Sequence, residues 1–181
     1  MTGSWAPWLR CGPTLGLSEM GAMDQLYQQL ILDHAQAANG RGLAERFDGE
    51  SFQVNPTCGD KVRLRVALEA SEPQRLATVT WQGEGCTISK ASTSMMIELV
   101  SGQDLAAVAR LEDAMEQMMH SRGEGVSDQV ADLLGDAIAL QGVAQYPMRI
   151  KCALLGWMAL KDATAKALAG DNRPVYVPKG V

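Results

Sequence analysis

The first clear hydrophobic pattern in the chain has the spacing of an α-helix. Between residues 24 and 38, apolar side chains recur every three or four positions, at Leu26, Leu30, Ile31 and Ala35. The segment ends in the sequence NGRG, and glycines in this position favour a helix stop. A helix is therefore predicted over residues 24–38. No helical or strand period precedes it, so residues 1–19 are expected to be a disordered N-terminal extension.

Three segments with strand-like patterns follow. They are ESFQVN, KVRLRVALE and RLATVTWQ, which begin at Glu50, Lys61 and Arg75. In the second segment apolar residues alternate strictly with charged ones, and in the third Ala77, Val79 and Trp81 fall on one face. The sequence ASEPQR between the last two is typical of a turn. The pattern predicts an antiparallel hairpin with one buried face.

After Cys86 the hydrophobic period becomes helical. One helix is predicted up to Ser101-Gly102, and a second begins after Asp104, a residue type that favours the N-cap position. The segment SDQVADLLGDAIALQGVAQ has a weaker helical pattern, and a last long helix is predicted from Pro147 to Ala169. This order predicts an α+β fold, in which a small three-stranded antiparallel sheet has helices packed on one face.

Composition and charge narrow the possible partners. The 181 residues are 46% hydrophobic and 20% charged, with a formal net charge of -5. This balance gives no electrostatic reason to expect a nucleic acid or an anionic membrane as partner. Charged residues also interrupt the apolar runs well short of the roughly 18 residues that a membrane span needs. We expect a single domain over residues 20–170, an extended tail over residues 171–181, and a cytoplasmic location.

Three of the four cysteines stand at positions that suit a metal site. Scattered cysteines in a cytosolic protein favour metal binding or reactivity over disulfides, and Cys11, in the extension, is expected to have no role. Cys58 follows the first strand, Cys86 opens a helix whose N-terminus favours a thiolate, and Cys152 lies in the second turn of the last helix. In an extended segment Cys58 and Asp60 project to the same side. Together these residues offer three thiolates and one carboxylate, which suits tetrahedral zinc.

The pattern alone leaves other interpretations open. A cysteine on a helix, such as Cys152, is often a small buried hydrophobic residue, and Asp60 can cap backbone groups in an ordinary turn. His34 and His120 are expected to be structural or exposed. A stripe of methionines is expected to pack in the core or at an interface, and it comprises Met95, Met96, Met115, Met118 and Met119.

Three longer segments resemble a known family. NPTCGDKVRLRV, GEGCTISKASTSMM and RIKCALLGWMAL are similar to the signature segments of the IscU/SufU (NifU N-terminal) iron–sulfur cluster assembly proteins, and LYQQLILDHAQAANGRG resembles the opening helix of that family. The resemblance extends from about Met23 to Ala169. It implies an α+β fold with a three-stranded antiparallel sheet. It also implies one metal site at the edge of the molecule, formed by Cys58, Asp60, Cys86 and Cys152.

Two departures from the IscU-type scaffold proteins indicate the SufU-type branch. Lys151 stands where those scaffolds carry a histidine, and Cys152 follows Cys86 by 66 positions, with residues 103–145 as a helical insertion. The resemblance implies that the protein holds zinc and accepts persulfide sulfur on Cys58 from a SufS-type cysteine desulfurase, as a sulfurtransferase partner rather than a stand-alone enzyme. Arg149 matches a family arginine near the site, and a scaffold or an apo-protein would receive the sulfur next.

Two alternative functions remain open at this point. In an IscU-type scaffold, the same four residues would hold iron or a [2Fe–2S] cluster for transfer to apo-proteins, because cysteine thiolates bind either metal. In a purely structural zinc module that binds partners, removal of zinc would unfold the chain. The sequence AQAANGR after Asp33-His34 departs from the family pattern, so no role of His34 is carried over.

Overall fold

The computed structural model describes residues 17–174. The first helix, α1 (Leu17–Ala37), begins seven residues before its predicted start at residue 24. Residues 17–19, expected to be part of a disordered extension, are therefore the first residues of this helix. The rest of that extension, residues 1–16, and the end of the predicted tail, residues 175–181, lie outside the described residues.

The sheet has the three antiparallel strands that the alternating pattern predicted. They are β1 (Gly49–Asn55), β2 (Asp60–Leu68) and β3 (Leu76–Glu84), in the order β1-β2-β3. Val62, Leu64 and Val66 on β2 are buried, whereas the charged residues between them are partly exposed. The register pairs Asn55 with Asp60, so the turn between β1 and β2 contains only residues 56–59.

One residue of the predicted buried face of β3 lies on the other side. Val79 and Trp81 are buried as expected, but Ala77 is exposed and Leu76 is buried in its place. The cause is a shift in the β2–β3 register between Ala67 and Leu68, where the pairing moves from Ala67↔Thr78 to Leu68↔Leu76. An extra residue of this kind reverses the side-chain alternation, and a short alternating sequence does not reveal it.

Five further helical segments follow the sheet. They are α2 (Thr87–Val100), α3 (Leu105–His120), α4 (Asp128–Leu134), the 3-10 helix η1 (Gly135–Gln145) and α5 (Pro147–Leu168). The segment with the weak helical pattern before Pro147 therefore forms two elements, α4 and η1. They join at Gly135, where φ is 48°. The predicted insertion, residues 103–145, contains α3, α4 and η1.

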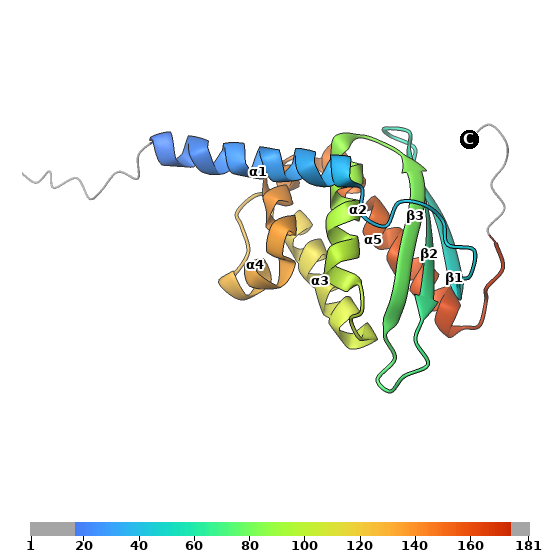
Figure 1. Ribbon diagram of the computed structural model, residues 1–181. Helices are drawn as coiled ribbons and strands as arrows, with labels where there is room; N and C mark the ends of the chain where they lie inside the picture. Colours follow the sequence, from blue (N-terminus) through green and yellow to red (C-terminus); the bar gives the residue numbers. More distant parts are fainter. Residues whose placement is uncertain (1–16, 175–181) are drawn as a thin grey trace, which may run out of the picture.

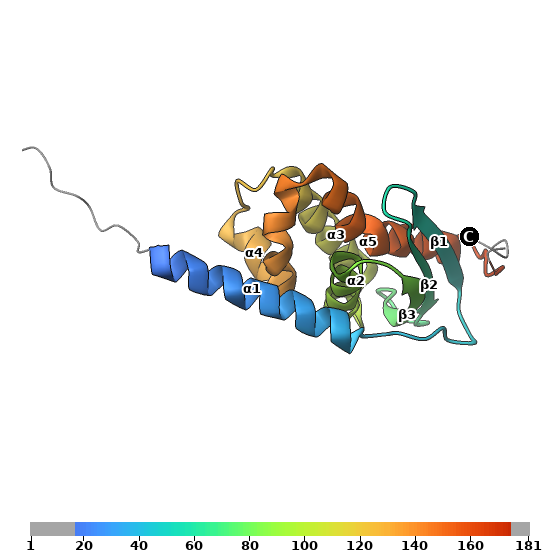
Figure 2. The same ribbon diagram turned by 90° about the horizontal axis from the view of Figure 1, so that it is seen from above.

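The helices gather on one side of the sheet, as the α+β prediction required (Figures 1 and 2). α5 packs against β1 and β2 and also contacts α2, while α1 packs along α2. The N-terminal part of α1 extends beyond the rest of the fold in both views. Because α2 and α5 both border the sheet, the start of each helix can reach the turn between β1 and β2.

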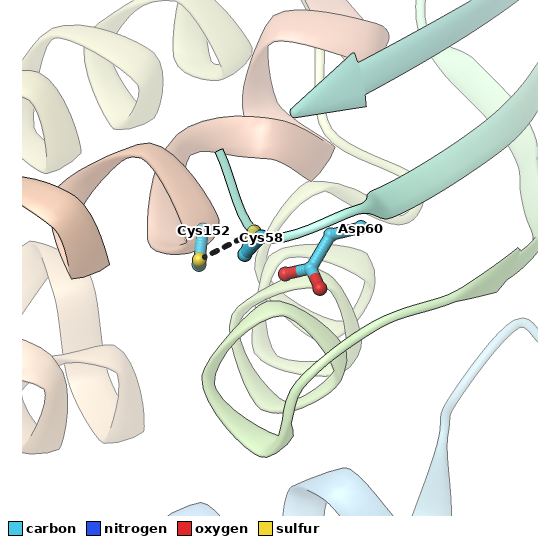
Figure 3. A group of neighbouring side chains, drawn as sticks. All are labelled: Cys58, Asp60 and Cys152. Atoms are coloured by element: carbon cyan, nitrogen blue, oxygen red, sulfur yellow. Dashed lines mark hydrogen bonds between the residues drawn. The ribbon is translucent and has the colours of Figure 1, made fainter. Parts of the chain in front are cut away.

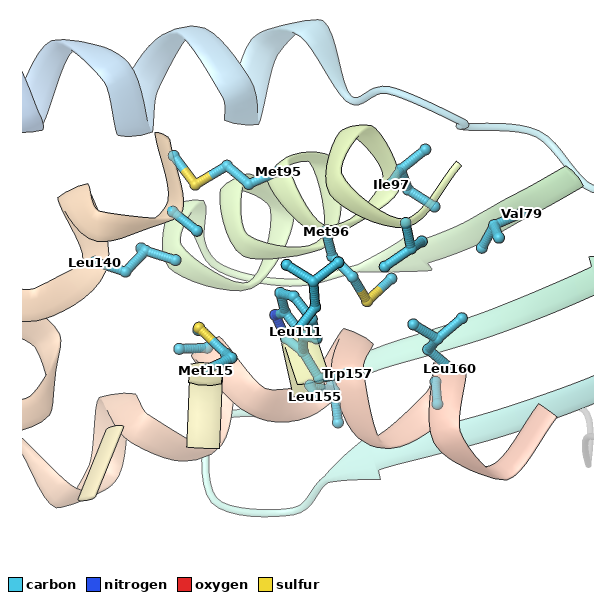
Figure 4. Packing of buried hydrophobic residues seen from close by; sticks show 14 of the residues in the cluster. Val79, Met95, Met96, Ile97, Leu111, Met115, Leu140, Leu155, Trp157 and Leu160 are labelled. Carbon is cyan, nitrogen blue, oxygen red and sulfur yellow. The ribbon is translucent and has the colours of Figure 1, made fainter. Parts of the chain in front are cut away.

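Buried apolar side chains from the helices and the sheet form one core (Figure 4). The predicted methionine stripe belongs to it, since each of its members is at most 1% exposed: Met95, Met96, Met115, Met118 and Met119. Methionine fills irregular gaps between helices well, which suits a core in which several helices pack on one another and on the sheet. Within residues 17–174, no helix has both the length and the apolar character that a membrane crossing requires.

Candidate metal centre

The turn between β1 and β2 places Cys58 at the surface. Asn55, the last residue of β1, holds the turn in two ways: its backbone carbonyl accepts the Gly59 N–H at 2.9 Å, and its side-chain Oδ1 accepts the Thr57 N–H at 3.1 Å. Gly59 has a φ of 77°, a value that residues other than glycine rarely adopt. This tight turn leaves Cys58 exposed between two fixed strand ends.

Asp60 continues the buried face of β2 and is only 3% exposed. Its Oδ1 accepts the backbone N–H of Cys86 at 3.0 Å, whereas its Oδ2 is buried and has no hydrogen-bond partner among the described residues. Gly85 makes room for this carboxyl group, since a Cβ at that position would lie 3.0 Å from Asp60 Cγ. A buried carboxylate oxygen without a partner is costly, and it indicates a missing cation or donor.

Cys86 is the N-cap of α2, as the change of period predicted. Its φ and ψ are -68° and 167°, and its Sγ accepts the Ser89 N–H at 3.5 Å. The side chain is exposed. The free N–H groups and the positive end of the helix dipole at this position attract negative charge.

Cys152, in the second turn of α5, supplies a buried sulfur. It is 4% exposed, its Sγ lies 3.2 Å from the Sγ of Cys58, and Asn55 Nδ2 donates to it at 3.6 Å. Burial raises the pKa of the Cys152 thiol, and the hydrogen bond with Cys58 and the nearby charge of Cys86 raise it further. A positive charge beside Cys152 would therefore be needed to keep its sulfur ionised.

The structure brings three of the four predicted ligands into one cluster. One donor atom from each of Cys58, Asp60 and Cys152 lies within 4.8 Å of the others, and Figure 3 shows the three side chains converging. Cys86 lines the same pocket of about 350 Å³ as Cys58 and Cys152, but its sulfur is not within that cluster. The set fits zinc, because two soft sulfurs and the unpartnered Asp60 oxygen are the donor types that zinc takes in proteins.

Arg149 stands at the wall of this pocket, one turn before Cys152 on α5. Its guanidinium group lies over the ring of Tyr146, 4.9 Å from the ring centroid. The stacking fixes the guanidinium group against the Tyr146 ring. The position agrees with a role beside the site, which remains a prediction.

Asn55 and Gly85 contact the cluster, and the hydrophobic pattern of the sequence did not point to them. Asn55 connects the turn to Cys152, and Gly85 accommodates the carboxyl group of Asp60. A signal for the first was present, because an asparagine followed by proline often hydrogen-bonds to the backbone two residues later. The role of Gly85 depends on a contact between β2 and β3 that spacing alone does not give.

The chain is similar to known proteins in sequence and in structure. The profile of the NifU-like N-terminal domain family matches residues 26–153. The zinc-dependent sulfurtransferase SufU of Bacillus subtilis is 38% identical over 152 residues, which cover 82% of this chain and 96% of that protein. The iron–sulfur cluster assembly scaffold protein IscU of Streptococcus pyogenes is 35% identical over 150 residues, covering 82% and 88%.

A solved structure has the same fold. It is a protein from Fervidobacterium islandicum described as a candidate iron–sulfur cluster assembly scaffold for the SUF system. The two structures align with a TM-score of 0.67 at 31% identity, and the alignment covers 77% of this chain and 96% of that one.

Proposed function

Because this chain belongs to the NifU-like N-terminal domain family, we propose that it is a SufU-type, zinc-dependent acceptor of persulfide sulfur from a cysteine desulfurase. The observation that carries the proposal is the contrast between two adjacent sulfurs. Cys58 is exposed on a four-residue turn, and 3.2 Å away Cys152 is buried on a helix. One sulfur can therefore meet a partner protein while the other stays inside.

The proposed metal ligands are Cys58, Asp60, Cys86 and Cys152. Three of them already cluster, and Cys86 lies at the same pocket. Zinc bound there would keep the sulfurs deprotonated and would add no redox chemistry of its own. Asp60 would contribute its unpartnered Oδ2, while its Oδ1 remains bonded to the backbone of Cys86.

Cys58 is the proposed nucleophile. Its thiolate attacks the outer sulfur of a cysteine persulfide on a SufS-type desulfurase. A bond forms between Cys58 Sγ and that sulfur, the sulfur–sulfur bond of the desulfurase breaks, and the desulfurase cysteine leaves as a thiolate. The exchange is balanced without an external oxidant or reductant. Its product is a persulfide on Cys58, which a scaffold or an apo-protein would then take up.

Arg149 is proposed to assist from the wall of the pocket. Its guanidinium group is held against Tyr146, and the residue lines the same pocket as Cys58. A fixed positive charge there favours the negative charge of the incoming persulfide and of the persulfide product. The proposed setting is the cytoplasm, where the thiols of both proteins stay reduced.

Lys151 and the insertion over residues 103–145 favour sulfur acceptance over a scaffold function. The scaffold alternative rests on the sulfur donors, which also suit a [2Fe–2S] cluster as cargo, and on the similarity to an IscU. The two functions differ in what the purified protein contains. A sulfur acceptor is expected to contain zinc and to be colourless, whereas a scaffold would contain iron and absorb visible light.

The test measures sulfide release by a SufS-type desulfurase with and without the zinc-loaded protein. We expect the chain to stimulate turnover and mass spectrometry to find one extra sulfur atom on Cys58. Cys58→Ser should abolish both effects, while Cys11→Ser, the same change outside the described residues, should abolish neither. Full stimulation by Cys58→Ser, or by protein stripped of zinc, would overturn the proposal.

A further inference from the structure

A second group of potential metal ligands lies away from the cysteines. It consists of His34 near the end of α1, Glu98 on α2 and Asp136 on η1, and one donor atom of each lies within 4.8 Å of the others. We propose that His34, Glu98 and Asp136 form a second cation site, which takes a divalent transition metal that prefers nitrogen and oxygen ligands. Mn²⁺, Fe²⁺ and Co²⁺ are of this class.

His34 forms the inner wall of this site. It is 7% exposed, and its two ring nitrogens have different surroundings. Nδ1 lies 3.5 Å from Ser94 Oγ, while Nε2 lies 3.3 Å from an Asp136 oxygen and 3.9 Å from a Glu98 oxygen. The hydrogen bond at Nδ1 gives His34 the structural role that its sequence context predicted. Nε2, the usual metal-binding nitrogen, faces two carboxylates.

The surroundings hold Glu98 in a ligand-like position. Asn39 Nδ2 donates to one oxygen of Glu98 at 2.6 Å, which leaves the other oxygen towards His34. Asn39 is itself fixed, because its N–H donates to Ser94 Oγ at 3.0 Å and its carbonyl accepts the indole N–H of Trp81 at 2.8 Å. Supporting hydrogen bonds of this kind orient the ligands in metal sites of proteins.

The charge and exposure of the group suit a cation. Within residues 17–174, no lysine or arginine forms an ion pair with Glu98 or Asp136, so with a neutral imidazole the group carries two negative charges. Their side chains are about half exposed, at 54% and 58%, which leaves room for water as further ligands. An ion with bonds of about 2.0–2.2 Å holds its ligands about 3 to 4 Å apart, so small side-chain movements would complete the site.

The proposed site is distinct from the cysteine pocket. Cys86 precedes α2, and Glu98 lies 12 positions later, which separates them by about 18 Å along the helix axis. The new group also contains no sulfur, so the two sites prefer different metals. A metal at His34 would link α1 to α2 and η1, and this link does not depend on sulfur transfer.

The experiment uses the full chain with one equivalent of Zn²⁺ and adds Mn²⁺ as the probe. Mn²⁺ prefers oxygen and nitrogen ligands, so it leaves the cysteines to zinc. We expect the NMR signals of residues around His34 to broaden, and the melting temperature to rise. Asp136→Asn and Glu98→Gln should each weaken Mn²⁺ binding at least tenfold. The control Asp132→Asn changes an exposed carboxylate of α4 and should bind Mn²⁺ like the unchanged chain.

Three results would overturn the proposal. The first is the absence of broadening and of a melting shift in the unchanged chain. The second is broadening around Cys152 in place of His34. The third is equal Mn²⁺ affinity in Asp136→Asn, Glu98→Gln and the control. Both test substitutions change half-exposed side chains to amides of the same size, so both variants are expected to fold.

Discussion

Asn55 connects the cysteine that is exposed to the cysteine that is buried. Its side chain accepts a hydrogen bond from the turn that carries Cys58 and donates one to the sulfur of Cys152. Asn55 is only 3% exposed, so its side chain is kept from bulk water. It is a positioning residue, because it acts on the site through the sulfur of Cys152 and through the shape of the turn.

Asn55→Ala is expected to lower the free energy of unfolding by about 1–2 kcal/mol, because the hydrogen bonds to Thr57 and Cys152 are both lost. It should also weaken zinc binding about tenfold, since Cys152 and the turn would no longer be held together. Chelator competition measures the second effect. The control is Gln53→Ala, which removes a side chain of the same strand that donates to Ser51 Oγ. Zinc affinity that is equal in the two variants would contradict the positioning role.

At the residue scale, sequence reasoning found the donors but not what orients them. Cys58 and Asp60 were predicted to share one side of an extended segment, but residues 56–59 form a turn in which Gly59 has a φ of 77°, so strand alternation does not reach Cys58. The two side chains are close because the turn folds back, and not because of the pleat. The bond from Asn55 to Cys152 joins residues 97 positions apart, and no local sequence pattern encodes such a contact. Local patterns also do not show that one oxygen of Asp60 is buried without a partner. The same holds for the cluster of His34, Glu98 and Asp136.

At the scale of elements, α2 and α5 carry two of the proposed ligands and are joined by a buried polar contact. Ser92 Oγ on α2 donates to the carbonyl of Ala153 at 2.6 Å and accepts the indole N–H of Trp157 at 3.2 Å. Ser92 and Trp157 are 1% and 4% exposed. The contact fixes the spacing between the helix that begins after Cys86 and the helix that contains Cys152.

Ser92→Ala is expected to cost about 1–3 kcal/mol of stability, because it leaves the Trp157 N–H buried without an acceptor. Trp157→Phe removes that N–H together with part of the ring. Phenylalanine has no N–H, so replacing Ser92 in the double variant leaves no donor unpaired. The combined loss of stability should therefore be smaller than the sum of the two single losses. Urea denaturation of the four proteins measures the coupling. Strictly additive losses would show that the contact contributes nothing.

A second prediction at this scale concerns Glu112 on α3. Burial raises its pKa from 4.5 to about 7, although Lys161 on α5 opposes the change. A carboxyl group with a raised pKa in the folded state binds its proton more tightly there. Its contribution to stability is therefore complete below about pH 4.5 and is lost as the pH rises to about 7.

Glu112→Gln should remove this loss. Compared with the unchanged protein, the variant should therefore gain stability at pH 8 relative to pH 5. The measurement is the urea midpoint at the two pH values. Glu124→Gln, an exposed change just after the same helix, serves as the control and should leave the pH dependence as it is. If the unchanged protein and Glu112→Gln show the same pH dependence, Glu112 titrates as an ordinary surface carboxyl.

The order and type of the elements were predictable from hydrophobic periodicity, and the exceptions have identifiable causes. The three strands, α2, α3 and α5 agree with the patterns because each buries one regular face. Ala77 was placed on the wrong face because of a register shift, and η1 was not separated from α4 because a 3-10 helix keeps a similar spacing. The start of α1 at Leu17 lies in a glycine-containing stretch without apolar repeats, so no periodicity marked it.

At the scale of the whole molecule, the hydrophobic core and the cysteine site contribute to stability separately. The core contains many fully buried side chains, such as Leu64, Met96 and Met118, that do not belong to the site. A domain with a core of this kind does not need a metal to fold. Zinc would instead join the β1–β2 turn to α5, because Cys58 and Cys152 come from these two segments.

Removal of zinc is therefore expected to leave the far-ultraviolet circular dichroism nearly unchanged. It should lower the melting temperature by roughly 5 to 10 °C relative to protein with free zinc at about 100 times Kd. Zinc loading should also fall at acidic pH, since protons compete for the thiolates. Complete loss of secondary structure after chelation would instead support the structural zinc module.

The pairing of Asn55 with Asp60 has a consequence for how this site can be altered. Asp60 belongs to the pleat of the sheet, so an insertion within β2 would turn its carboxyl group outward along with every residue before the insertion. Residues added between Pro56 and Gly59 would leave that pleat intact and move only Cys58. The length of the turn alone therefore sets how far Cys58 reaches towards a partner. The other donor residues keep their positions in the fold.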